Sequence, residues 1–178
     1  MMDESELLHT AVADLALVQD VEQAQQIIRG AARRLANAHG STVVLLDHGH
    51  CFYADEDAVS PLWKGQRFPV RQCISGWSIL NRQPAIVPDI QLDERVPQEA
   101  YRPTFVKSLV IVPMRVEDPL GAIGAYWIQP HRVTDEELTR LQSLAEAAGA
   151  ALARLLPSAD SMRGASSLVS SEATGAPA

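Results

Sequence analysis

The chain has 178 residues and a formal net charge of −7, and apolar residues make up 47% of it against 21% charged residues. This balance is typical of a soluble globular protein, and the length favours one domain plus extensions. The acidic charge, with no clustered Lys/Arg run to offset it, argues against nucleic acid or an anionic membrane as the main partner. No stretch approaches the roughly 18 apolar residues of a membrane span, and the acidic start is unlike a signal peptide. We therefore expect a cytoplasmic protein.

Three segments carry helix-start signals. Asp3, Asp20 and Thr134 each precede a Glu or Gln by three residues, a spacing in which the first side chain caps the opening turn. The helix after Asp20 is expected to end near His39, before Gly40. One stripe of this helix is apolar and predicts packing against a sheet. The stripe consists of Val21, Ala24, Ile27, Ile28, Ala31 and Leu35.

Short apolar strands fill the middle of the chain. Residues 42–46 and 51–53 flank the turn Asp47-His-Gly-His and predict a hairpin. Further strands are expected over residues 67–70, 85–87, 108–115 and 122–128. Short helices are expected at Ser60-Pro61, over residues 74–82, and from Pro97 through Tyr101. This order predicts an antiparallel sheet with helices gathered on one face.

The helix predicted from Asp135 to about Leu156 has heptad spacing, and a shorter 3-4-3 repeat lies near the N-terminus. Such a stripe either covers its own domain or forms a parallel dimer seam, and the pattern alone does not decide between them. On the second interpretation a homodimer interface contains Leu8, Leu15, Leu138, Leu141, Ala145, Ala148, Leu152 and Leu155. Past Pro157 the composition turns to Ser, Ala, Gly and Pro, which predicts a disordered tail over residues 157–178.

The stretch from Trp63 to Trp127 carries a family resemblance. It reads W-K-G-Q-R-F-P-V-R-Q-C-I-S-G-W, then V-K-S-L-V-I-V-P-M-R-V, then P-L-G-A-I-G-A-Y-W. Over roughly Val21 to Leu155 this order resembles a GAF domain, in particular the GAF sensor modules of bacterial histidine kinases. The resemblance implies an α+β, PAS-related fold whose central antiparallel sheet has about six strands, with terminal helices on one face and short crossing helices on the other. The expected division is an N-terminal helix over 1–20 and a GAF domain over 21–156.

The resemblance also implies where a ligand would bind. In GAF domains the ligand usually lies between the sheet and the short helices that cross it. Carried onto this chain, the ligand-binding residues are Trp63, Phe68, Cys73, Trp77, Asp89, Ile90, Tyr101, Phe105 and Ser108. Trp77 and Tyr101 would stack on a planar ligand, or else the aromatic residues fill a dry core. Asp89 would face the ligand or bond loop amides.

Four cationic side chains lie on the same crossing segments: Arg71, Arg82, Arg102 and Lys107. A guanidinium there would grip a carboxylate or a phosphate, or else it is solvated and pairs with nearby acidic residues. These residues leave the identity of the ligand open.

Three specialised GAF activities fit poorly. Residues 97–107 contain no cysteine, which argues against covalent bilin attachment. GAF-type methionine sulfoxide reductases carry a Gly-Val-Cys-Gly step, where this chain reads Cys73-Ile-Ser-Gly76, so Ser75 stands in the nucleophile's place and Cys51 is distant in sequence. Neither Asn37 nor Asn81 begins the signature of cyclic-nucleotide GAF domains.

The hairpin turn also contains three residues of types that bind metals. His48, His50 and Cys51 offer three ligand types within four residues, but successive strand side chains face opposite sides, so a plain hairpin turn is favoured and no metal is expected. Cys51 and Cys73 are expected to be reduced.

The expected function is a cytoplasmic, non-enzymatic sensory module. It would bind a small molecule or respond to a redox signal, and relay the change through its terminal helices to a partner such as a histidine kinase. The alternative is a ligand-free dimerisation or interaction module, and a GAF-type reductase is less favoured.

Overall fold

The computed structural model describes residues 2–156, so the tail predicted over residues 157–178 lies outside the described part of the chain. Two helices come first, α1 (Glu4–Leu17) and α2 (Val21–Leu35), followed by β1 (Gly40–Asp47), β2 (His50–Ala58) and β3 (Arg67–Pro69). The middle contains η1 (Val70–Gln72), α3 (Ile74–Asn81), β4 (Ala85–Val87), η2 (Ile90–Leu92) and α4 (Gln98–Tyr101). The chain then forms β5 (Ser108–Met114), β6 (Gly121–Trp127) and the long helix α5 (Asp135–Leu155).

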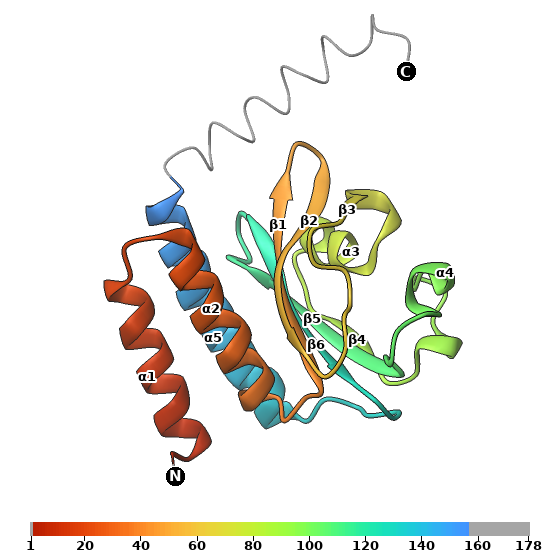
Figure 1. Ribbon diagram of the computed structural model, residues 1–178, viewed down its shortest axis with the longest axis horizontal. Coiled ribbons are helices and arrows are strands. Elements are labelled where there is room, and N and C mark those ends of the chain that lie inside the picture. The colour runs from red at the N-terminus through yellow and green to blue at the C-terminus, as the bar shows by residue number, and fades with distance from the viewer. Residues whose placement is uncertain (1, 157–178) are drawn as a thin grey trace, which may run out of the picture.

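The six strands form one antiparallel sheet in the order β3-β2-β1-β6-β5-β4. Helices α2 and α5 cover one face, with α1 packed on their outer side, and α3 and α4 lie on the other side of the sheet (Figure 1). The predicted α+β architecture is therefore confirmed, including the strand count and the two-sided arrangement of helices.

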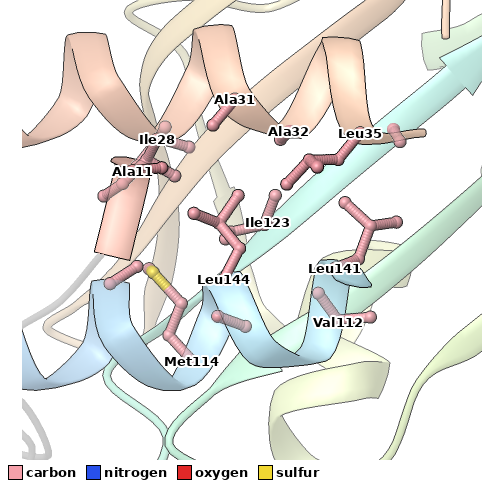
Figure 2. Close-up of a cluster of buried hydrophobic side chains, with 14 of the residues drawn as sticks. Ala11, Ile28, Ala31, Ala32, Leu35, Val112, Met114, Ile123, Leu141 and Leu144 are labelled. Carbon is pink, nitrogen blue, oxygen red and sulfur yellow. The ribbon is translucent and has the colours of Figure 1, made fainter. Parts of the chain in front are cut away.

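Every residue of β5 and β6 is buried, because the pleat sends alternate side chains into two separate cores. The first core lies under the terminal helices, where Leu141 and Leu144 of α5 and Ile28 of α2 meet Val112 and Ile123 of the sheet (Figure 2). The second core lies between the sheet and α3 and includes Leu109, Ile111 and Tyr126.

The predicted helix starts are confirmed by their capping bonds. The side chains of Asp3, Asp20 and Thr134 accept the backbone amides of residues 6, 23 and 137, at 2.8, 2.8 and 3.0 Å. The predicted end of the second helix is wrong: α2 stops at Leu35, and Gly40 begins β1. A Cβ at Gly40 would lie 2.9 Å from the Phe105 ring, so glycine serves a close approach there.

The predicted hairpin is confirmed, with His48 and Gly49 at φ 51° and 78° in its two-residue turn. Strand β2, however, runs five residues past the predicted end at Tyr53. The register with β1 shifts between Val43 and Val44, a bulge that reverses the faces of the acidic residues that follow.

The acidic residues in the second half of β2 form ion pairs with α2. Asp55 lies 2.9 Å from Nη1 of Arg29, and Asp57 lies 2.7 Å from Nη1 of Arg33. These two arginines are one helical turn apart, so they meet two side chains that are two residues apart on one strand face. An apolar pattern therefore could not reveal this half of the strand.

The short helix predicted at Ser60-Pro61 is wrong, because residues 59–64 form an irregular loop. The Glu56 carboxylate organises this loop by accepting the backbone amides of Leu62, Trp63 and Lys64 at 2.9, 3.0 and 2.8 Å. The Glu56 side chain thus accepts hydrogen bonds from three successive backbone amides of the loop.

The heptad residues of α5 face their own domain. Leu15, Leu141, Ala145, Ala148 and Leu152 are at most 1% exposed and belong to the core under the terminal helices. Leu8, Leu138 and Leu155 are half-buried at its edge. Of the two interpretations of the heptad stripe, the structure supports the one in which the stripe packs against its own domain. The five buried side chains are not available at the surface to form the predicted interface.

Leu152→Asp should therefore destabilise the single chain by about 3 kcal/mol or more, because it places a carboxylate in an apolar core. Ala150→Asp, on the exposed side of the same helix, should cost less than about 1 kcal/mol. Urea unfolding measures both free energies. Equal losses in the two variants would contradict the inward orientation of Leu152.

Candidate functional site

A surface groove lies beside α3. It has a volume of about 580 Å³, within the range of small-molecule sites. Its wall combines η1, α3 and the loop before α4, and consists of Val70, Arg71, Gln72, Cys73, Trp77, Leu80, Asn81, Glu94, Arg95, Val96 and Pro97. Two of the predicted ligand-binding residues, Cys73 and Trp77, meet here.

Trp77 and Arg95 contact each other in the wall of the groove. The guanidinium carbon of Arg95 lies 4.3 Å from the centre of the Trp77 ring, in cation–π contact. The Asp93 carboxylate holds this guanidinium by accepting hydrogen bonds from Nε at 3.0 Å and from Nη2 at 2.7 Å. The hydrogen bonds from Arg95 lower the pKa of Asp93, so the pair stays ionised. One side of the indole is therefore covered by a fixed cation.

The first turn of helix α3, beside the groove, is held by a sulfur cap and a close backbone approach. The Cys73 sulfur accepts the Gly76 amide at 3.4 Å and so caps the helix. A Cβ on Gly76 would lie 1.6 Å from the Val70 carbonyl oxygen, so only glycine allows η1 to lie against α3.

Cys51 lies beside Cys73. The first comes from β2 and the second from the start of α3, and both belong to the core between the sheet and α3. The side chain of Cys73, next to it, raises the pKa of Cys51, and the Cys51 thiol in turn lowers the pKa of Cys73. The two cysteines that are distant in sequence are thus direct neighbours in the fold.

The space between the sheet and the crossing helices is filled by aromatic side chains. Trp63 contacts Tyr53, Tyr101 and Tyr126, with ring centres 5.5, 4.6 and 5.5 Å apart. Trp63 and Tyr101 are each only 4% exposed, and the Trp63 indole donates to the Ala100 carbonyl at 3.0 Å. Trp63 and Tyr101 therefore belong to the packed core between the sheet and α3. Trp63 and Phe68 also border a separate hollow of about 300 Å³.

The remaining predicted ligand residues lie apart from the groove. Ser108 shares a strand face with Val110, so it points toward the terminal helices, and its hydroxyl donates to the Gln129 carbonyl at 2.8 Å. Asp89 accepts the Gln91 amide at 3.0 Å, which matches the loop-bonding interpretation. Ile90 is buried, and Phe105 packs against the aromatic core.

Ser75, which stands in the place of a reductase nucleophile, is fully buried. Its hydroxyl shares a hydrogen bond of 2.9 Å with the Tyr53 hydroxyl. Burial raises the pKa of Tyr53, so this phenol keeps its proton and supplies no base to the serine.

The predicted ligand-binding set left out four residues around the site: Cys51, Tyr53, Tyr126 and Arg95. A signal existed for the first two, because they alternate along one strand and so share a face. No pattern pointed to Arg95, since its contact with Trp77 depends on the path of the loop between β4 and α4.

Neither a membrane helix nor a metal cluster marks residues 2–156. No helix in this range has both the length and the apolarity to cross a bilayer. Within the same range, no three His, Cys, Asp or Glu side chains gather closely enough to hold a metal ion. His48 and His50 are exposed in the hairpin turn while Cys51 is buried, as the hairpin interpretation requires.

The family model described as GAF domain matches residues 18–153, so the chain belongs to the GAF domain family. The sequence matches no curated protein. Solved structures agree with the fold. The GAF domain of a phosphoenolpyruvate-protein phosphotransferase from Coxiella burnetii is 17% identical, with a TM-score of 0.75 over 86% of this chain and 94% of that one.

Two other similar structures come from proteins of different kinds. Free methionine-R-sulfoxide reductase from Neisseria meningitidis is 14% identical, with a TM-score of 0.71 over 87% of this chain and 93% of the reductase. A domain assigned to a two-component sensor histidine kinase of Sinorhizobium meliloti 1021 is 17% identical, with a TM-score of 0.62 over 79% and 96% of the two chains. At these identities the likeness concerns the fold alone.

Gly76→Ala should destabilise the protein by about 2 kcal/mol or more, because the added methyl group meets the Val70 carbonyl. Gly30→Ala is the matched control, since a Cβ there has no neighbour within 4 Å and alanine favours the helix by about 0.5–1 kcal/mol. Thermal or urea unfolding compares them. A neutral Gly76→Ala variant would show that η1 does not lie against α3.

Proposed function

We propose that this chain is a cytoplasmic sensory module of signal transduction, without catalytic activity of its own. It binds a small molecule in the groove beside α3 and passes the change to a signalling partner such as a histidine kinase. The observation that carries the proposal is the groove itself, a volume of about 580 Å³ with an aromatic wall and fixed charge.

The lining favours a ligand with a flat apolar part and an acidic group. Trp77, Leu80 and Val96 offer apolar surface. Arg71 is exposed at the groove, and the Arg95 side chain remains 28% exposed despite its bond to Asp93. Arginine groups bind carboxylates and phosphates through paired hydrogen bonds.

A second hollow of similar size supports ligand binding less well. It lies beside the turn after β5, has a volume of about 530 Å³, and is lined by Arg115, Val116, Glu117, Asp118 and Glu146. It has no aromatic wall, and three of its five side chains are acidic. Specific small-molecule sites are usually lined mainly by apolar and aromatic groups.

A path from the groove to the terminal helices exists through the sheet. Helix α3 contacts β5 and β6 on one face, and α5 contacts the same two strands on the other. A ligand that binds one arrangement of α3 more tightly would shift the packing equilibrium across these strands. The partner would read that shift on the exposed side of α1 and α5.

One observation favours an alternative, a ligand-free interaction module. The space where GAF ligands usually lie is filled by Trp63, Tyr101 and Tyr126. In that case the outer surface of the terminal helices would form a homodimer or bind a partner. A reductase function has less support, because the serine in the nucleophile's place is buried against Tyr53.

Native mass spectrometry of the full chain purified from its own host tests the proposal. We expect extra mass on the folded protein that disappears on denaturation. Trp77→Ala should weaken this binding at least about tenfold, because buried aromatic contacts dominate binding energy. Leu92→Ala is the control, since Leu92 is 84% exposed and outside the groove lining.

The outcomes separate the two proposals. A ligand retained by Leu92→Ala but lost from a folded Trp77→Ala supports the sensory module. A ligand-free dimer favours the interaction module instead. A ligand-free monomer would count against both ligand binding and homodimerisation.

A further inference from the structure

The two thiols of the chain meet at the inner wall of the groove beside α3. We propose that Cys51 and Cys73 form a reversible intramolecular disulfide, oxidised by a small peroxide that enters through this groove. The proposal concerns a modification site and does not depend on whether a ligand occupies the groove.

The geometry supports a bond between these two sulfurs and no other pair. They are the only cysteines among the 178 residues, and hydrogen bonds on either side of them hold their two segments together. The Val70 amide donates to the Gly49 carbonyl at 3.0 Å, and the Tyr53 and Ser75 hydroxyls are 2.9 Å apart, so Cys51 and Cys73 lie opposite each other between these two bonds. They lie on separate elements, in a strand and at the start of a helix, and both are held in the same core. A disulfide requires such close, opposed side chains.

Access assigns the first step to Cys73. Its side chain lines the groove, and the residue is 7% exposed, whereas Cys51 is fully buried behind it. The neighbouring Cys51 thiol and the Gly76 amide, which donates to the Cys73 sulfur at 3.4 Å, lower the pKa of Cys73. The thiolate is the reactive form, so Cys73 is the attacking group and Cys51 the resolving group.

The chemistry balances in two steps. The Cys73 thiolate attacks one peroxide oxygen, the O–O bond breaks, and an S–O bond forms as the departing alkoxide or hydroxide takes a proton. Cys51, losing its proton, then attacks the Cys73 sulfur; the S–O bond breaks, the S–S bond forms, and water leaves. Overall the two thiols lose two protons and two electrons, and the peroxide gains them and is reduced to water and an alcohol, or to two water molecules when it is hydrogen peroxide.

The bond would link β2 to the residue that caps α3. Trp77 lies one helical turn beyond Cys73 and borders the groove, so oxidation would fix the start of α3 beneath this wall. The closed loop would also restrict the unfolded chain, and the oxidised protein should melt about 5 °C or more above the reduced one.

The test uses the full chain, reduced and then exposed to hydrogen peroxide under native conditions. Intact mass spectrometry should show a loss of two hydrogen atoms, and non-reducing peptide mapping should find Cys51 joined to Cys73. Dithiothreitol should restore the original mass. These readouts use the unmodified protein, so they do not depend on the folding of any variant.

Two matched variants test the order of the steps. Cys51→Ser should stop at a sulfenic acid on Cys73, which dimedone traps. Cys73→Ser should leave Cys51 unmodified under the same exposure, because that thiol is buried. If both single-cysteine variants react at equal rates, the assigned order is wrong.

Three results would overturn the proposal: both thiols remaining free while the protein stays folded, a disulfide that forms only after urea unfolding, or disulfides that only link separate chains. The native mass measurement of ligand binding is made on the reduced protein. Failure of the ligand proposal and failure of the thiol proposal are therefore observed separately.

Discussion

The structure depends on the burial of β5 and β6 on both faces. A strand pair with no exposed residue requires cover on each side, and this chain provides two different kinds. Long amphipathic helices supply one layer, where regular side chains such as Leu141 and Ile28 pack against Val112 and Ile123. The other cover consists of short helices and loops, which cannot form a continuous surface. The groove lies in this irregular layer.

The irregular layer is held by individual polar contacts. Glu56 binds three successive loop amides, and Asp93 fixes Arg95 against Trp77. Such contacts place each loop where helical packing cannot. They also explain why the aromatic side chains are divided: Trp63 completes the core, while Trp77 is left half-exposed at the groove. A site built this way can differ between family members that share the same sheet.

Much of the fold could be predicted from the sequence, because its signals are local. The caps at Asp3, Asp20 and Thr134 depend on residues three positions away, and strands β5 and β6 are almost entirely apolar. The prediction failed where a distant partner overrode the local pattern. The acidic end of β2 is a strand because Arg29 and Arg33 of α2 neutralise it. Ser60-Pro61 does not begin a helix because Glu56 takes the amides that follow.

The sequence by itself determined the family, the order of elements and the two amphipathic faces, since periodicity and capping require only neighbouring residues. Tertiary structure alone decided that the heptad stripe faces its own sheet, because any apolar surface nearby can bury such a stripe. It also decided that Ser108 lies on the far side of the sheet from Trp77. Finally, it placed Cys51 against Cys73, because a contact between two elements depends on how the sheet and α3 pack and not on the spacing of two cysteines along the chain.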